Sequence, residues 1–260
     1  MTDQPSDRPG ELVHYRVDDH VAALVLDSQH NRNALSRQLV QELYDGLARA
    51  EQDDDVKVVL VRAEGRSFCS GADMSEASQD GMEKGAEVLV ALQRRIVTLP
   101  KPVVARVQGS VRAGGIGIVA AADIAVAAHD STFAFTEVRL GVVPAVILVT
   151  VLPRLSPHAA HELLLTGETF DARRAVAVGL LNSAVPAEQL DAEVDRFTGM
   201  LIKGGPEALA MTKQLLCTRR ISQDFAAMLE LSAERFASAE GQEGIRAFAE
   251  KRPASWIPPG

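Results

Sequence analysis

The feature that most constrains the fold is a glycine-rich turn between two apolar segments. A run of small and β-branched residues at Val103–Val107 leads into Gly109–Gly117, which contains four glycines, and an Ala/Val/Ile-rich segment follows. This order predicts a strand, then a turn that presents bare backbone amides, then the start of a buried helix. The fold should therefore bring backbone N–H groups to the edge of the core.

Hydrophobic spacing predicts the other elements. A hairpin is expected at residues 12–17 and 21–26, and an amphipathic helix at residues 36–51 with Ser36 as its N-cap. The remaining predictions are strands at 56–61, 103–107, 124–127 and 132–135, and helices at 82–98, 157–165, 171–178, 188–203, 207–217, 222–239 and 243–250. This order favours an α/β fold with a flexible N-terminus (1–10), an α/β core (11–200) and a helical C-terminal region (201–260).

Composition narrows the class of protein. The formal net charge is -8 and the basic residues are scattered, which argues against a nucleic-acid partner. Cys69 and Cys217 lie far apart in sequence, so we expect no disulfide, no metal site built on cysteine, and a cytoplasmic location. The longest apolar stretch, Val142–Leu152, is shorter than the ~20 residues of a membrane span. No membrane span and no secretory signal are expected.

Glu137 is the most informative single residue, because it is an acid inside an apolar run that contains Phe133 and Phe135. Burial should raise the pKa of its carboxyl group, which suits general acid–base chemistry near neutral pH. A second small-residue turn ends at Ala72, and the glycine-rich turn contains Gly114. Their backbone amides could form an oxyanion hole for a thioester enolate.

The same residues also have structural interpretations. From the neighbouring sequence alone, Glu137 is consistent with a capping residue or a member of an ion pair. The glycines are consistent with tight packing of the backbone. Cys69 has no histidine in its neighbouring motifs and is expected to be a packed thiol. His158 and His161 are expected on a solvated helix face rather than on a metal, and Asp123 is expected to brace a turn.

Seven segments in order carry a resemblance to a known family. They are Asn31–Leu35, Arg66–Asp73, Lys101–Gly109, Gly114–Gly117, Ala122–Asp123, Glu137–Gly141 and Leu165–Gly167. Over nearly its whole length the chain resembles the crotonase superfamily, the enoyl-CoA hydratase/isomerase family. The resemblance implies a crotonase-like spiral of ββα turns, a helical trimerisation region, a homotrimer or dimer of trimers, an acyl-CoA thioester substrate, and no metal or redox cofactor.

The resemblance also assigns site residues. Glu137 would be the catalytic acid, and Ala72 and Gly114 would supply the oxyanion hole. The residues expected to bind coenzyme A or the acyl group are Arg32, Ala34, Ala72, Asp73, Met74, Ser75, Gly114, Phe248 and Lys251.

One departure from the family pattern affects the reaction. Gly117 stands where two-carboxylate hydratases carry their first glutamate, and the candidates for a replacement are Asp80, Glu83 and Glu87. The surrounding sequence is similar to that of bacterial methylglutaconyl-CoA-type hydratases, which share this glycine. Arg112 and Ala113 depart from the aromatic residue and glycine of that subgroup. Arg112 is either a surface side chain or a partner for a CoA phosphate or a substrate carboxylate.

Four functions remain open from the sequence. The preferred one is an acyl-CoA hydratase, which adds water to a 2-enoyl-CoA to give a 3-hydroxyacyl-CoA. The alternatives are a double-bond isomerase that uses the single acid Glu137, a non-catalytic acyl-CoA binder, and an NAD-dependent dehydrogenase. The last rests on Gly115, Gly117 and Ala120, which imitate a dinucleotide fingerprint. Acyl-chain length and branching, and trimer against hexamer, are not determined.

Overall fold

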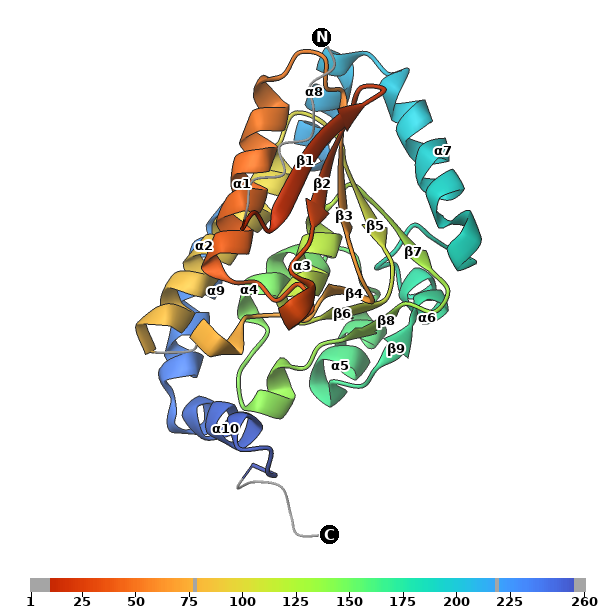
Figure 1. Cartoon of the computed structure of the whole chain (residues 1–260). Coiled ribbons are helices and arrows are strands. Elements are labelled where there is room, and N and C mark those ends of the chain that lie inside the picture. Colours follow the sequence, from red (N-terminus) through yellow and green to blue (C-terminus); the bar gives the residue numbers. More distant parts are fainter. Residues whose placement is uncertain (1–9, 77–78, 218–219, 255–260) are drawn as a thin grey trace.

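The computed structural model describes residues 10–76, 79–217 and 220–254 (Figure 1). Most of the N-terminal segment predicted to be flexible lies outside these residues. Within them two β-sheets are surrounded by helices, as expected for an α/β fold. No helix in the described part of the chain is long and apolar enough to cross a membrane.

The larger sheet has six strands and contains the predicted hairpin. β1 and β2 pair antiparallel, and the other neighbouring strands are parallel. Across the sheet the order is β1 (Val13–Asp18), β2 (Val21–Leu26), β3 (Val58–Ala63), β5 (Val103–Val107), β7 (Ile124–Ala128) and β10 (Ser183–Val185). The parallel strands are almost continuously apolar because helices cover both faces.

The smaller sheet has four strands, of which only β8 was predicted. Its order is β4 (Ser67–Cys69), β6 (Ser110–Arg112), β8 (Thr132–Ala134) and β9 (Phe170–Asp171). Phe133 of β8 is buried in the core and stacks on Phe170 of β9, with ring centroids 5.6 Å apart. The opposite face carries polar residues, including Ser67 and Ser110, whose hydroxyl groups are 2.9 Å apart.

The chain alternates between the two sheets in a repeated pattern. β3, β4 and the helix α2 (Gln79–Thr98) form one unit, and β5, β6 and α3 (Gly114–Ala121) form the next. β7 and β8 then lead through the 3-10 helix η3 (Glu137–Leu140) to α4 (Ala145–Val151). Each unit places one strand in each sheet before its helix, which confirms the predicted spiral of ββα turns.

Helices cover the larger sheet on both faces (Figure 1). α1 (Arg37–Gln52) packs its apolar stripe onto one face, and the hydroxyl group of Ser36 caps it by accepting a hydrogen bond from the Leu39 amide, as predicted. α7 (Leu190–Ile202) covers the other face. Two shorter helices that precede α7 in the chain, α5 (Pro157–Thr166) and α6 (Ala172–Ala177), lie near the smaller sheet.

The C-terminal helices pack against the spiral core. They are α8 (Pro206–Leu216), α9 (Arg220–Ala237) and α10 (Ala239–Ala249). Lys213 of α8 is buried and forms a 2.7 Å ion pair with Asp123, which also accepts a hydrogen bond from the Val103 amide. Asp123 therefore braces its turn, as predicted. α9 lies against α2 and α4 and buries Phe225 between them.

Some boundaries differ from the predictions. β3 begins at Val58 rather than Val56, because the Val56 amide closes a turn onto Asp53. α2 begins at Gln79 rather than at residue 82. α4 was not predicted, since its residues are apolar on all sides and give no helical stripe.

Glycine lets α3 approach its neighbours closely. All eight residues of α3 are buried. A Cβ atom on Gly117 would lie 2.6 Å from Cγ2 of Ile147 and 2.8 Å from Oε1 of Gln93. That Oε1 atom accepts a 2.8 Å hydrogen bond from Thr150. Because Gln93 is fully buried and held by this bond, it has little room to move.

We expect Gly117→Ala to lower the free energy of unfolding by about 1–3 kcal/mol, the usual cost of overpacking a core. This loss should exceed the ~1 kcal/mol by which alanine favours a helix over glycine. The matched control is Gly199→Ala in α7, where an added Cβ has no heavy atom within 4 Å. The control should gain stability. Urea unfolding of both variants tests this, and a gain at both positions would contradict the packing argument.

Candidate active site

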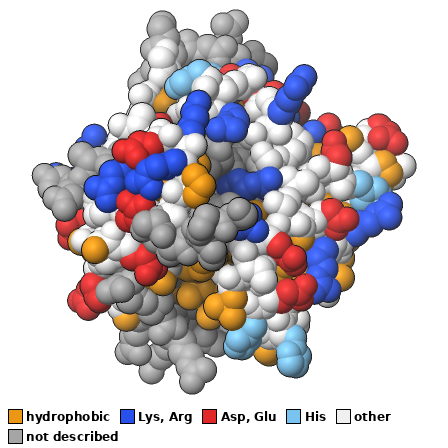
Figure 2. Space-filling model, turned by 90° about the horizontal axis from the view of Figure 1, so that it is seen from below, with side chains coloured by type: hydrophobic (Ala, Val, Ile, Leu, Met, Phe, Trp, Pro, Cys, Tyr) orange, Lys and Arg blue, Asp and Glu red, His pale blue; other side chains and the backbone are white. Residues whose placement is uncertain are grey.

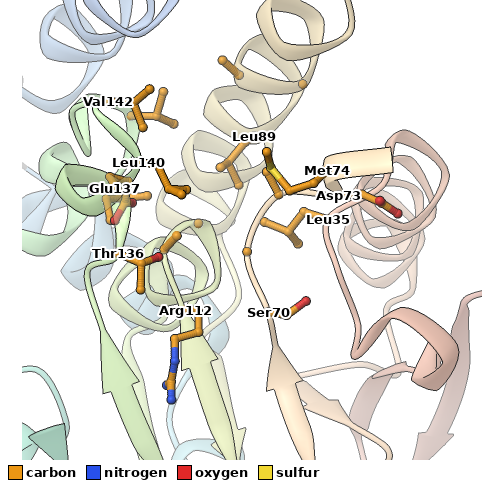
Figure 3. Close-up of a pocket in the computed structure, with 18 of the residues that line it drawn as sticks. Leu35, Ser70, Asp73, Met74, Leu89, Arg112, Thr136, Glu137, Leu140 and Val142 are labelled. Carbon is orange, nitrogen blue, oxygen red and sulfur yellow. The ribbon is translucent and has the colours of Figure 1, made fainter. Parts of the chain in front are cut away.

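A cavity of about 600 Å³ opens where several distant segments of the chain meet (Figure 3). Its wall is made by the loop after β4, the N-terminal half of α2, the turn from β6 to α3, η3, α4 and the C-terminal helices. Apolar side chains such as Leu35, Leu89 and Val142 predominate, with a few polar groups among them. A pocket of this size and composition suits an organic ligand.

The cavity has an exposed, basic side. Arg32 and Arg37 are both exposed and lie on its wall. The face on which α10 lies is hollowed near its middle, and basic side chains are visible in the hollow (Figure 2). Basic groups at an opening attract anionic ligands from solution.

Glu137 begins η3 and lies on the wall with Leu140 and Val142 (Figure 3). The residue as a whole is half-buried, but its Oε2 atom is enclosed and has no hydrogen-bond partner among the described residues. Burial raises the pKa of the carboxyl group to about 7. The predicted direction of the shift is confirmed. A carboxyl group with this pKa holds and releases a proton near neutral pH.

The Ala72 amide is free to bind a ligand. Leu35 donates a hydrogen bond to the Gly71 carbonyl and accepts one from the Asp73 amide, at 2.8 and 3.4 Å. In such a parallel bridge the N–H group of the residue between them points the other way. In the described part of the chain the Ala72 amide has no hydrogen-bond partner, and Ala72 lies on the cavity wall.

The Gly114 amide is free for a different reason. Gly114 is the first residue of α3, and the first amides of a helix have no partner within it. Ala113 turns the chain into the helix with a φ of 46°, and its own amide bonds the Ala134 carbonyl. No described residue accepts a hydrogen bond from the Gly114 amide, which carries the positive end of the helix dipole. Two free amides therefore line the cavity that holds Glu137.

Most of the predicted site residues lie on this wall, and three do not. Those on the wall are Glu137, Ala72, Gly114, Arg32, Asp73, Met74 and Phe248. Ala34 is buried beside the wall, Lys251 follows α10 on the surface, and Ser75 donates a 2.7 Å hydrogen bond to Asp73. The sequence analysis did not assign Ser67, Ser70 or Ser110 to the site, although they are also wall residues and lie in the two small-residue turns.

No second free acid appears at the wall among the described residues. Gly117 packs inside the core and is not on the wall. The candidate replacements Glu83 and Glu87 are exposed on α2, and neither lies on the cavity wall. The side chain of Asp80 lies outside the described part. The other two acids on the wall have partners. Asp73 accepts hydrogen bonds from Asn31 and Ser75, and Glu76 forms an ion pair with Arg37.

The dinucleotide fingerprint does not form. The strand predicted at 103–107, β5, ends several residues before Gly114, and the short strand β6 lies in that gap and ends at Arg112. Gly115 and Gly117 lie inside α3, where an added Cβ on either would meet core atoms within 3 Å. β6 and the next strand, β7, also belong to different sheets, whereas the fingerprint needs a βαβ unit within one sheet.

The structural interpretations of the remaining candidates are confirmed. Cys69 is a buried free thiol, and burial raises its pKa to about 12, so it is not a nucleophile near neutral pH. His158 and His161 are exposed on α5. Cys217 is also free, as predicted.

Comparisons with known proteins agree with this site. The enoyl-CoA hydratase/isomerase family model matches residues 16–258. Mitochondrial enoyl-CoA hydratase domain-containing protein 3 of Mus musculus is 33% identical over 96% of this chain and 86% of its own length. A crotonyl-CoA hydratase of Syntrophomonas wolfei is 29% identical over 92% of this chain and 95% of its own length.

A solved structure shows the same fold. The crystal structure of an enoyl-CoA hydratase from Mycobacterium avium superposes with a TM-score of 0.87 and 44% sequence identity, covering 95% of this chain and 99% of that one. The match extends over both sheets and the C-terminal helices. The chain therefore belongs to the enoyl-CoA hydratase/isomerase family, within the crotonase superfamily.

Proposed function

We propose that the protein is an acyl-CoA hydratase that adds water to a 2-enoyl-CoA to give a 3-hydroxyacyl-CoA. The observation that carries the proposal is one enclosed carboxyl group with a pKa near 7 in the same cavity as two unpaired backbone amides. The crotonyl-CoA hydratase among the relatives carries out this class of reaction by its name.

In the proposed mechanism the amides of Ala72 and Gly114 bind the thioester oxygen. Water attacks C3 while the Glu137 carboxylate takes one of its protons, and the double-bond electrons move to form an enolate held by the two amides. Protonated Glu137 then gives the proton to C2, which restores the carboxylate. One acid can serve both steps because its pKa is close to neutral pH. No metal or redox cofactor is needed.

The isomerase remains the second candidate, because one acid suffices to move a proton between two carbons. In that reaction Glu137 would take a proton from C2 of a 3-enoyl-CoA and return it to C4. A non-catalytic binder would use the same wall without turnover. The suggested similarity to methylglutaconyl-CoA-type hydratases remains a prediction.

Coenzyme A binding is part of the same proposal. Exposed Arg32 would meet phosphate groups, Met74 and Phe248 would contact the pantetheine arm, and Asp73 would hold the loop through its bonds to Asn31 and Ser75. Ala34 and Lys251 lie next to this wall rather than on it, so any contact they make is at its margin.

The proposal also includes an oligomeric assembly and a cytoplasmic location. The exposed apolar residues Met211, Leu215 and Leu216 on α8 suit the predicted trimer or dimer of trimers, in which a neighbouring subunit would cover them. The two free thiols suit the cytoplasm, where thiols stay reduced.

We expect Glu137→Gln to lower kcat for crotonyl-CoA by several orders of magnitude while acyl-CoA affinity changes little. Glutamine keeps the shape of the side chain but cannot carry the proton. The measurement is loss of absorbance of the conjugated enoyl thioester, with Glu83→Gln as a control on the exposed face of α2. A near-normal rate in Glu137→Gln would refute the assignment. A band that rises with a 3-enoyl-CoA, and stays constant with crotonyl-CoA, would identify an isomerase.

The pH profile should report the raised pKa of Glu137. The carboxylate must be ionised to accept a proton from water, and its pKa is about 7 rather than 4.5. We therefore expect kcat/KM to level off above about pH 8 and to fall tenfold per pH unit well below 7. A profile that stays flat down to pH 5 would show that the active base is a different group.

A further inference from the structure

Thr136 lies beside Glu137 on the cavity wall. It follows the fully buried Phe135 and directly precedes η3, so the core on one side and a helical turn on the other fix its place. In Figure 3 the two residues lie one above the other on the same wall, and the hydroxyl oxygen of Thr136 is directed toward the interior of the cavity. The hydroxyl group therefore faces the space in which the proposed reaction takes place.

The hydroxyl group of Thr136 has no hydrogen-bond partner in the described part of the chain. A threonine that precedes a helix usually has an extended backbone and accepts a hydrogen bond from an amide of the first turn. Thr136 makes no such bond, because its own backbone is already helical, with a φ of -84° and a ψ of -4°. Its side chain is therefore free both to donate and to accept a hydrogen bond in the cavity.

The carboxyl group of Glu137 can contact a water molecule in the cavity through one oxygen at most. Its Oε2 atom is enclosed, so only Oε1 can face the cavity. A single hydrogen bond leaves a water molecule free to turn about that bond. For addition to C3, a lone pair of the water must point at C3 while one of its hydrogens points at the base. A second hydrogen bond from the wall would fix this orientation.

Four other polar groups of the wall are engaged with the protein itself. The hydroxyl groups of Ser67 and Ser110 bond each other at 2.9 Å, and Ser70 donates to a backbone carbonyl at 3.1 Å. The side chain of Arg112 donates to two backbone carbonyls of its own sheet and runs away from Glu137 (Figure 3). The threonine hydroxyl differs from all four, because it is next to the acid and has no partner.

A neutral hydroxyl group can orient the water without changing the acid. Burial is the cause of the raised pKa of Glu137, and the hydrogen bond that opposes it comes from the residue's own backbone. A cation beside the carboxylate would lower this pKa. A hydroxyl group that bonds the water instead of the carboxylate leaves the pKa at about 7.

We propose that the hydroxyl group of Thr136 holds the attacking water together with Glu137, which makes Thr136 a further catalytic residue for hydration. The water directs one hydrogen to the Glu137 carboxylate and the other to Oγ1 of Thr136. Its oxygen bonds to C3 as the first hydrogen moves to Glu137. The second hydrogen stays on the oxygen and becomes that of the product hydroxyl group, so Thr136 gains and loses no proton. This proposal rests on the hydratase function and names another residue of the same site.

The test compares hydration with a reaction of Glu137 that adds no water. Hydration of crotonyl-CoA is followed by loss of the conjugated absorbance band. Deuterium incorporation at C2 of 3-butenoyl-CoA in D2O, followed by mass spectrometry, reports enolate formation by Glu137 and the two amides. The ratio of the two rates is the readout, since a loss of stability or of acyl-CoA binding would lower both rates together.

We expect Thr136→Val, which replaces the hydroxyl group by a methyl group of similar size, to lower kcat for hydration about tenfold or more. Deuterium incorporation should stay close to the wild-type rate. Thr136→Ser keeps the hydroxyl group and should retain most of the hydration, whereas Glu137→Gln should lose both reactions. Hydration at the wild-type rate in Thr136→Val would overturn the proposal. An equal fall of both rates would also overturn it, because the residue would then act on Glu137 or on the fold.

The matched control is Thr98→Val, the same substitution at an exposed threonine of α2 outside the cavity wall. Its ratio should equal that of the wild type, and a ratio that falls as far as in Thr136→Val would contradict a specific role of Thr136. Failure of the hydratase function has a different signature. A wild type that incorporates deuterium but adds no water would be an isomerase, and the role of Thr136 in hydration would fall with it.

Discussion

The close packing of α3 is the constraint on which the site depends. Its glycines allow the helix to approach Cys69 on one side and Ile147 with Gln93 on the other, at distances that a side chain would prevent. This contact fixes where the helix begins, and hence where the Gly114 amide lies. Ala113 accepts a positive φ to complete the turn. Strained backbone of this kind persists only when the surrounding packing enforces it. The Gly114 amide, which is the proposed oxyanion donor, is thus positioned by the core rather than by a loop.

Burial gives the other half of the site its chemistry. The same apolar wall that would bind an acyl chain in the proposed function also withdraws solvent from the Glu137 carboxyl group and raises its pKa to about 7. A two-acid hydratase can divide base and acid between two groups. By the family resemblance Gly117 stands where the first acid of such hydratases would be, and it lies so close to Gln93 and Ile147 that a carboxylate there would have to displace the core. Tight packing of α3 and a single titrating acid are therefore two consequences of one arrangement.

The sequence predicted those parts of the molecule whose signals are local. A few neighbouring residues were enough to indicate the turn at the glycines from Gly109 to Gly117 and the helix cap at Ser36. They were also enough to indicate the apolar surroundings of Glu137. The strands β4, β6 and β9 were missed because two or three residues are too few to show alternation. The contact of Gly117 with Gln93 was also missed, because it depends on how α2 and α3 pack. The small-residue turns suggested the amides of Ala72 and Gly114 as oxyanion donors, and the resemblance to the family assigned them this role.

Two unpaired charges of the cavity wall, Glu137 and Arg112, are kept electrically separate. Burial is what raises the pKa of Glu137, and no cation lies near enough to lower it. Arg112, for its part, has no carboxylate close enough to raise its pKa. Had the two groups paired, Glu137 would be a permanent carboxylate with a low pKa and a poor proton donor to C2. Their separation leaves Glu137 able to titrate near neutral pH.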